Sequence, residues 1–180
     1  HAGSKGMLRE GKGTEFEGGV RVPFVARWPG KIPAATTSNE PTMTIDLLPT
    51  LVGYAGGVVQ TEPKIDGKNI SAIIEAKPNA KSPQEAYYFY WGDALHAVTS
   101  GKWKLHFPHP YLHIIVGGSD GKPGKGETRK IELSLFDLDA DITESKNVAD
   151  QNPDVVKKLQ ILGDKIREEL GDSLTSKKGS

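Results

Sequence analysis

The sequence predicts an α/β fold, or α+β when the chain is taken alone, in which a small antiparallel sheet packs against a long C-terminal helix. Three patterns support this prediction. An apolar run at residues 20–28 is followed by apolar residues at helical spacing at 44–55, which is typical of a strand and helix of an α/β layer. Residues 86–107 alternate with a period of two, as strands do. Residues 153–170 carry an aliphatic stripe at helical spacing.

The charge and composition of the chain exclude several classes of function. The 180 residues hold 23 basic and 23 acidic side chains, so the net charge is zero, which argues against nucleic acid or an anionic membrane as a partner. No apolar run reaches the roughly 18 residues of a membrane-spanning helix. Cysteine is absent, which excludes a disulfide, a thiolate zinc site and a cysteine nucleophile within the chain.

The first half is predicted to consist of a loop, a strand and a helix. Residues 1–19 contain six glycines and should form a loop. The almost continuous apolar pattern of residues 20–28 predicts a strand that is buried on both faces. Residues 44–55 are predicted to form a helix with Pro49 in or near its first turn, and residues 71–76 are predicted to form one helical turn.

Composition also predicts where the chain divides. Residues 77–85 (K-P-N-A-K-S-P-Q-E) are polar and contain two prolines, which is typical of a linker. We therefore expect residues 1–76 to be the end of one domain and residues 86–171 to form an antiparallel-sheet subdomain. Residues 172–180 are expected to be a tail.

Within the predicted subdomain, residues 86–107 should form strands, the last two of which are joined by a Ser-Gly turn into a hairpin. Because side chains alternate across a strand, Trp103 and Leu105 should lie on one face and Lys104 and His106 on the other.

The remaining segments are predicted to be a loop, a strand and the long helix. Residues 117–130 combine glycine with four basic side chains, which indicates a mobile basic loop. Residues 131–138 alternate as a further strand. The helix at 153–170 should be capped by Asn152 and ended by Gly171.

An acidic cluster follows the predicted strand at 131–138. Asp137, Asp139 and Asp141 resemble half of a calcium loop, but the glycine and bidentate glutamate of such a loop do not follow at the required spacing. We therefore expect a solvated acidic edge and no metal ligands here.

Four sequence blocks are too specific for generic loops and strands. They are G-K-G-T-E-F-E-G-G-V-R-V-P at 11–23, I-D-L-L-P-T-L at 45–51, A-V-T-S-G-K-W-K-L-H-F at 97–107 and L-F-D-L-D-A-D-I-T-E-S-K-N at 135–147. In this order they resemble the C-terminal portion of the arylsulfatase-like sulfatases, which belong to the alkaline-phosphatase-like superfamily. The resemblance implies the C-terminal part of that fold and an activity in the hydrolysis of organic sulfate esters.

The resemblance also implies roles for particular residues. Lys12 matches the lysine that contacts the sulfate group in this family. A compact ammonium on a glycine loop suits that role, because it can stabilise charge that develops on the ester oxygens. Glu17 and Arg21 are expected to support the loop without touching the substrate.

Histidines after the predicted hairpin are candidates for the wall of the substrate cleft. His109 lies between two prolines and is the first candidate for substrate contact, together with His106 and His113. A hydrogen-bonded surface histidine is the alternative interpretation of His109.

The family's formylglycine nucleophile and its calcium ligands belong to segments that this sequence does not contain. We therefore expect the chain to bind neither cofactor and to be inactive alone, whereas the intact enzyme would need both. Expected partners are a sulfate-ester substrate (a sulfated glycan or an aryl sulfate) and the missing N-terminal part of the enzyme. Self-association through the apolar edge of residues 20–28 is a further expectation. The resemblance implies a periplasmic or secreted location.

Two other functions stay open on the residues alone. The same superfamily includes hydrolases of phosphodiesters and phosphonate esters. Alternatively, the basic residues of 117–130 could bind sulfated glycans in a non-catalytic module.

Overall fold

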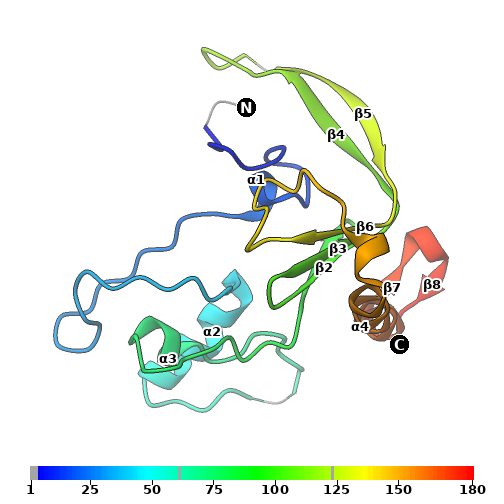
Figure 1. The fold of residues 1–180 in the computed structure, drawn as a ribbon. Helices are drawn as coiled ribbons and strands as arrows, with labels where there is room; N and C mark the ends of the chain where they lie inside the picture. The colour runs from blue at the N-terminus through cyan, green and yellow to red at the C-terminus, as the bar shows by residue number, and fades with distance from the viewer. Residues whose placement is uncertain (1–3, 61, 123) are drawn as a thin grey trace. The chain divides into compact units, whose positions relative to one another are not determined.

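The computed structural model divides the chain into two compact units, which are described separately (Figure 1). One unit joins the residues up to Val22 with Ala86–Ser180, and the other is Pro23–Glu85. The predicted domains grouped residues 1–76 together, whereas the structure packs the glycine loop with the C-terminal half. The structure describes residues 4–60, 62–122 and 124–180.

The unit Pro23–Glu85 contains the predicted helix. A 3-10 turn, η1 (Thr44–Asp46), leads into α2 (Leu47–Tyr54), and a single turn, α3 (Ser71–Ile74), follows. Pro49 is the third residue of α2, where its missing N–H costs no helical hydrogen bond. The predicted helix at 44–55 is therefore confirmed.

Asp46 and Thr50 organise this unit from its interior. The Asp46 carboxylate accepts hydrogen bonds from the backbone N–H of Lys68 (2.9 Å) and from the Gln84 side chain (2.8 Å). The buried Thr50 hydroxyl donates to the Asp46 carbonyl and accepts from the Ile70 N–H. Buried polar groups with satisfied hydrogen bonds hold the loops against α2.

The predicted buried strand at residues 20–28 is wrong. Val20 ends the short helix α1 (Glu17–Val20), and residues 21–28 have no strand partner among the described residues. Val22 is 74% exposed and Val25 is 89% exposed. A strand forms only where neighbours complete its ladder, so the apolar pattern alone does not produce one here.

In the other unit, four strands form an antiparallel sheet in the order β1-β2-β3-β6. The predicted hairpin is confirmed, and Gly101 takes a positive φ of 58° in its turn. The sheet consists of β1 (Tyr87–Trp91), β2 (Ala94–Ser100), β3 (Trp103–His106) and β6 (Ser134–Asp137).

The helix α4 (Pro153–Leu170) packs on β2 and β3 (Figure 1). Its bounds are those predicted, and Gly171 ends it at a φ of 81°. Asn152 precedes it, but its side chain donates to the Val148 carbonyl and makes no cap. The core between helix and sheet is formed by Leu95, Val98, Leu105, Phe107, Leu135, Val156, Leu159 and Leu162. The fold class predicted from the sequence is thus confirmed.

The two faces of the sheet carry different chemistry. Trp103 and Leu105 belong to the core under α4, and the register pairs Leu105 with Leu135 of β6. Lys104 and His106 alternate with them and so lie on the opposite face, as predicted. Both side chains are nevertheless completely buried. The segment that covers them is the glycine loop near the N-terminus.

A second ribbon replaces much of the predicted basic loop. β4 (His109–Val116) pairs with β5 (Lys125–Ile131), so the loop predicted at 117–130 is wrong over its last six residues. Ile131 consequently ends β5, and the strand predicted at 131–138 is shortened to β6. Backbone pairing with β4 orders β5, and composition did not reveal this partner.

The predicted tail at 172–180 is also partly ordered. β7 (Gly171–Asp172) pairs with β8 (Lys177–Lys178) around a 3-10 turn, η3 (Ser173–Thr175). The Asp172 carboxylate accepts a hydrogen bond from Arg167 Nε of α4 at 2.7 Å. No helix in the described part of the chain has the length and apolar character needed to cross a membrane.

A glycine in α4 allows the close approach of this helix to Phe107. A Cβ at Gly163 would lie 2.4 Å from Phe107 Cζ. We expect Gly163→Ala to lower the free energy of unfolding by about 1–3 kcal/mol, because overpacking outweighs the better helix propensity of alanine. Urea unfolding followed by circular dichroism measures the change.

The matched control is Lys158→Ala on the exposed side of the same helix. It should change the stability by less than about 0.5 kcal/mol. A Gly163→Ala protein as stable as the parent would contradict the described packing.

Candidate functional site

The segment that carries Lys12 forms a closed loop, called here the lysine loop (residues 9–18). Its ends meet where the Gly18 N–H donates to the Arg9 carbonyl at 2.8 Å. Lys12 lies near the middle of the loop with its side chain exposed. A short closed loop of this kind presents its tip while its ends stay fixed.

Two glycines allow the loop to close. A Cβ at Gly18 would lie 2.3 Å from the Arg9 carbonyl oxygen, and one at Gly19 would lie 2.1 Å from that of Thr14. Both approaches involve backbone atoms, so no larger residue fits without moving the chain. The Gly-Gly pair in the 11–23 block therefore has a steric reason in the structure.

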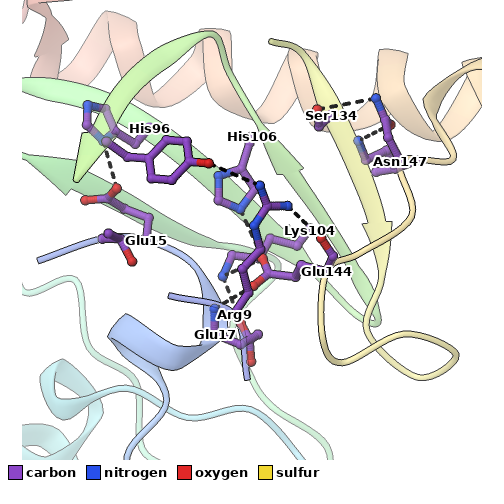
Figure 2. Close-up of polar contacts among 12 residues, drawn as sticks. Arg9, Glu15, Glu17, His96, Lys104, His106, Ser134, Glu144 and Asn147 are labelled. Carbon is purple, nitrogen blue, oxygen red and sulfur yellow. Dashed lines mark hydrogen bonds and ion pairs between the residues drawn. The ribbon is translucent and has the colours of Figure 1, made fainter. Parts of the chain in front are cut away.

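Buried charges lie beneath the lysine loop (Figure 2). Lys104 Nζ is 2.8 Å from Glu17 Oε1 and 3.3 Å from Glu144 Oε1. Lys104 and Glu144 are completely buried, and Glu17 nearly so. A buried ammonium between two carboxylates avoids the large cost of an isolated buried charge.

Glu144 also bonds directly to the loop (Figure 2). Its Oε2 accepts a hydrogen bond from the Glu17 backbone N–H at 2.6 Å, and its carbonyl accepts one from Arg9 Nη1 at 2.7 Å. His106 Nε2 lies 3.1 Å from Glu144 Oε1. The loop is thereby joined to β3 and to the turn after β6.

Burial sets the protonation of the groups beneath the loop. It holds the pKa of His106 well below its usual range, helped by the charge of Lys104. Burial raises the pKa of Glu144, although Lys104 and the Glu17 N–H oppose the rise. Because Glu144 offers an acceptor, a neutral His106 would donate from Nε2, which leaves Nδ1 without a partner among the described residues.

Aromatic packing completes the underside of the loop. Phe16 is completely buried and stacks on His106 with ring centroids 4.6 Å apart. The Arg9 guanidinium lies 4.1 Å from the centroid of the Phe16 ring. The loop therefore combines an apolar anchor with ionic ones, which restricts its conformations from both ends.

A second buried group contains Glu15, His96 and His109. His96 Nδ1 is 2.8 Å from Glu15 Oε2, while His109 Nε2 lies 3.8 Å from the same oxygen. Although burial acts to raise the pKa of Glu15, the hydrogen bond and charge of His96 lower it overall. Burial lowers the pKa of His109 to about 4, and the charge of His96 adds to this effect.

A carboxylate and two imidazoles are also a ligand set for a transition metal, and their ligand atoms lie within 4.8 Å of one another. The geometry does not fit one ion, because the rings of His96 and His109 are stacked 3.9 Å apart at an interplanar angle of 14°. Imidazole lone pairs lie in the ring plane, so nearly parallel stacked rings do not direct theirs at one point. The group fits better as a buried pair of Glu15 and His96, joined by a hydrogen bond, with His109 stacked on the His96 ring.

The acidic cluster after β6 does not offer a calcium site either. Asp137 accepts a hydrogen bond from Lys102 Nζ at 2.6 Å. Asp141 accepts from the backbone N–H groups of Ser145 and Lys146. Burial acts to raise the pKa of Asp141, but these bonds and those of nearby hydroxyls lower it to about 2. Both carboxylates are thus used to hold the turn, and the calcium implied by the resemblance does not fit them.

The structure places the predicted site residues unequally. Arg21 Nη1 pairs with Glu17 Oε2 at 3.3 Å, and the support that both residues are expected to give the loop stays a prediction. His106 and His109 have at most 1% exposed surface and lie in the interior of this structure. The predicted contact of these two side chains with substrate is therefore corrected. His113 is partly exposed and its Nδ1 bonds Glu10 at 2.7 Å.

Sequence reasoning missed Arg9, Lys104 and Glu144 as parts of the site. A charged residue in an alternating strand normally indicates a solvent-facing position. The sequence signal that could have found them is that Lys104 lies within the third block and Glu144 within the fourth.

Comparison with known proteins identifies the family. A family model for the C-terminal region of N-sulphoglucosamine sulphohydrolase matches residues 11–105. A model for the C-terminal region of aryl-sulfatase matches residues 82–178, which is more than half of the chain. The chain therefore belongs to the sulfatase family and corresponds to its C-terminal region.

Individual relatives agree. Human arylsulfatase A is 41% identical over 174 residues, which cover 89% of this chain and 34% of that protein. Human arylsulfatase D is 34% identical over 157 residues, 80% of this chain and 26% of that protein. The chain thus spans about a quarter to a third of the length of these two relatives.

Solved structures share the fold. The structure of Ps i-CgsB in complex with a neocarrahexaose superimposes with a TM-score of 0.66 at 23% identity, covering 96% of this chain and 34% of that one. At that identity the likeness shows the fold alone.

The buried histidines make stability depend on pH. The pKa of His109 falls to about 4 in the folded chain from an ordinary 6.5, so the unfolded state binds more protons between these values. The contribution of His109 to the free energy of unfolding is fully present above pH 6.5 and is lost as the pH falls toward 4. We expect His109→Gln to flatten the fall in unfolding free energy between pH 7 and pH 4.5, measured by urea unfolding.

Val98→Ala is the control, because it removes buried carbon from the four-stranded sheet of the same unit without removing a titrating group. It should lower stability equally at both pH values. If His109→Gln keeps the parent's pH dependence, the buried neutral imidazole is refuted.

Proposed function

We propose that this chain is the part of a sulfatase that presents Lys12 to the sulfate group of a sulfate ester. The observation that carries the proposal is the contrast between Lys12 and its loop. The ammonium is exposed, whereas Thr14, Glu15, Phe16 and Glu17 behind it are buried. An exposed cation on a fixed base is suited to an anionic ligand.

Lys12 would act by electrostatics. An ammonium is a compact point charge that can face a single sulfate oxygen. Charge that develops on the oxygens during ester cleavage would be stabilised by a cation that is already in place, which lowers the barrier without reorganisation. The carboxylates of Glu17 and Glu144, under the lysine loop, are both paired with Lys104.

The nucleophile and the calcium ligands would come from segments outside this sequence. The carboxylates of Asp137 and Asp141 are already used by Lys102 and by the turn after β6, and Lys12 has no nucleophilic role in this proposal. The chain would therefore contribute charge and part of the substrate wall, and it would be inactive alone.

The missing part of the enzyme is the proposed partner of the unit Pro23–Glu85. Several large apolar side chains of this unit are more than 50% exposed, and they lie in the irregular segment after α1 and in α2. They include Phe24, Val25, Leu48 and Leu51. Exposure on this scale is typical of a surface that another chain segment covers. These two relatives are about three times as long as this chain, in line with such a partner.

The proposed substrate is a sulfated glycan or an aryl sulfate. A structural neighbour was solved in complex with a neocarrahexaose, which supports a glycan as the class of substrate but does not identify which glycan. The alternative of a separate glycan-binding module on β5 receives less support, because Arg129 pairs with Glu127 and Lys130 pairs with Glu132. Phosphodiester or phosphonate ester hydrolysis stays an alternative to be tested with matched substrates.

The proposal predicts that Lys12→Ala in the complete enzyme lowers kcat for an aryl sulfate by about 10²–10³-fold, because one positive charge at the reacting group is lost. Steady-state kinetics with 4-nitrophenyl sulfate measures it. Lys5→Ala is the matched control, because Lys5 is also exposed near the N-terminus but lies outside the lysine loop.

Turnover of Lys12→Ala within about twofold of the parent would contradict the proposal. A parent enzyme that cleaves a matched bis-aryl phosphate diester and leaves the aryl sulfate intact would favour the phosphodiesterase alternative.

The chain alone should release no 4-nitrophenol from 4-nitrophenyl sulfate above a buffer blank, with or without added calcium. Its Lys12→Ala variant is the matched control and should give the same trace. Calcium-dependent turnover by the isolated parent chain would show that the nucleophile and metal ligands lie within it.

A further inference from the structure

We propose that Glu144 is a positioning residue for Lys12, and this rests on the proposed function of Lys12. Glu144 lies 127 residues after Glu17, yet it is completely buried against the lysine loop. Neither the sequence blocks nor the family matches assign it a role. The inference is that the turn after β6 holds the loop that presents the ammonium.

Glu144 contacts both ends of the lysine loop. Near the start, its backbone carbonyl accepts from Arg9 Nη1 at 2.7 Å. Near the end, its Oε2 accepts from the Glu17 N–H at 2.6 Å. Lys12 lies between these two anchors. Since one residue fixes both ends, the conformational freedom of the ammonium is reduced without any contact to it.

The charges around Glu144 explain why a carboxylate is needed. Lys104 Nζ lies between Glu144 and Glu17, at 3.3 Å and 2.8 Å. A neutral side chain at position 144 would leave the buried Lys104 with a single carboxylate partner. An undercompensated buried charge is costly, and rearrangement of the loop is the nearest way to relieve it.

The backbone conformation of Glu144 indicates that the surrounding turn holds this residue in place. Its φ is +50°, in the left-handed region that residues other than glycine rarely adopt. The turn that imposes this conformation is held by Asp141, whose carbonyl accepts from the Glu144 N–H at 3.2 Å. A strained residue at a fixed place indicates that its position is maintained by the surroundings.

A purely structural role for Glu144 is the competing explanation. Both explanations predict lower stability on substitution, so stability does not separate them. A positioning role predicts in addition that the loop loosens while the sheet stays ordered. It also predicts that the effect on catalysis depends on the presence of Lys12.

The first experiment uses this chain and does not depend on activity. Amide hydrogen exchange is compared for the parent, Glu144→Gln and Glu132→Gln, the last being an exposed acidic control. For Glu144→Gln we expect exchange at residues 9–18 to accelerate by about tenfold or more, with β2 and β3 unchanged. Unchanged exchange in the loop would overturn the proposal.

If Glu144→Gln does not fold, Arg9→Met tests the same anchor from the more exposed side. It removes the bond to the Glu144 carbonyl and keeps apolar contact with Phe16. The same acceleration at residues 9–18 is expected, and its absence would count against the proposal equally.

The second experiment is a double-mutant cycle in the complete enzyme. Glu144→Gln should lower kcat for the aryl sulfate by about tenfold or more with Lys12 present, and by less than about twofold in the Lys12→Ala background. Equal losses in both backgrounds would show a structural role only. If the parent hydrolyses no sulfate ester, the proposed function fails, while the exchange result still decides whether Glu144 holds the loop.

Discussion

The buried ion cluster of Lys104, Glu17 and Glu144 is the interaction on which the rest of the site depends. Its ammonium lies within 3.3 Å of both carboxylates, out of contact with water. Removing one partner from such a cluster typically costs about 3–5 kcal/mol, because a buried charge is left uncompensated. The cluster joins three segments that are distant in sequence, which is why the N-terminal loop belongs to the same compact unit as the C-terminal sheet.

This arrangement separates a rigid support from an exposed functional group. Phe16 and the ion cluster fix the base of the lysine loop, while Lys12 at its tip stays exposed. The unit Pro23–Glu85 shows the opposite character, with apolar side chains such as Val25 left uncovered. In the proposed enzyme, the rest of the protein would cover this exposed apolar surface. The lysine loop would supply positive charge to a site formed jointly by this chain and the rest of the enzyme.

Patterns that depend on local contacts were readable from the sequence. The amphipathic helix Pro153–Leu170 and the β2–β3 hairpin were predicted because periodicity reports burial against a single neighbouring layer. The strand expected at residues 20–28 failed because a ladder needs partners that the apolar pattern does not specify. Glu144 and Lys104 were missed because pairing of buried charges is a property of tertiary structure. The Gly-Lys-Gly block indicated the loop of Lys12 as a candidate, and the structure shows which buried groups hold that loop.

The most direct test of this account is a crystal structure of the complete enzyme with inorganic sulfate bound. The account predicts that Lys12 Nζ lies within hydrogen-bonding distance of a sulfate oxygen, about 2.7–3.2 Å, while Glu144 keeps its bonds to Arg9 and to the Glu17 backbone. A sulfate ion bound in the catalytic cleft with Lys12 directed into solvent, or a lysine loop detached from Glu144, would contradict it.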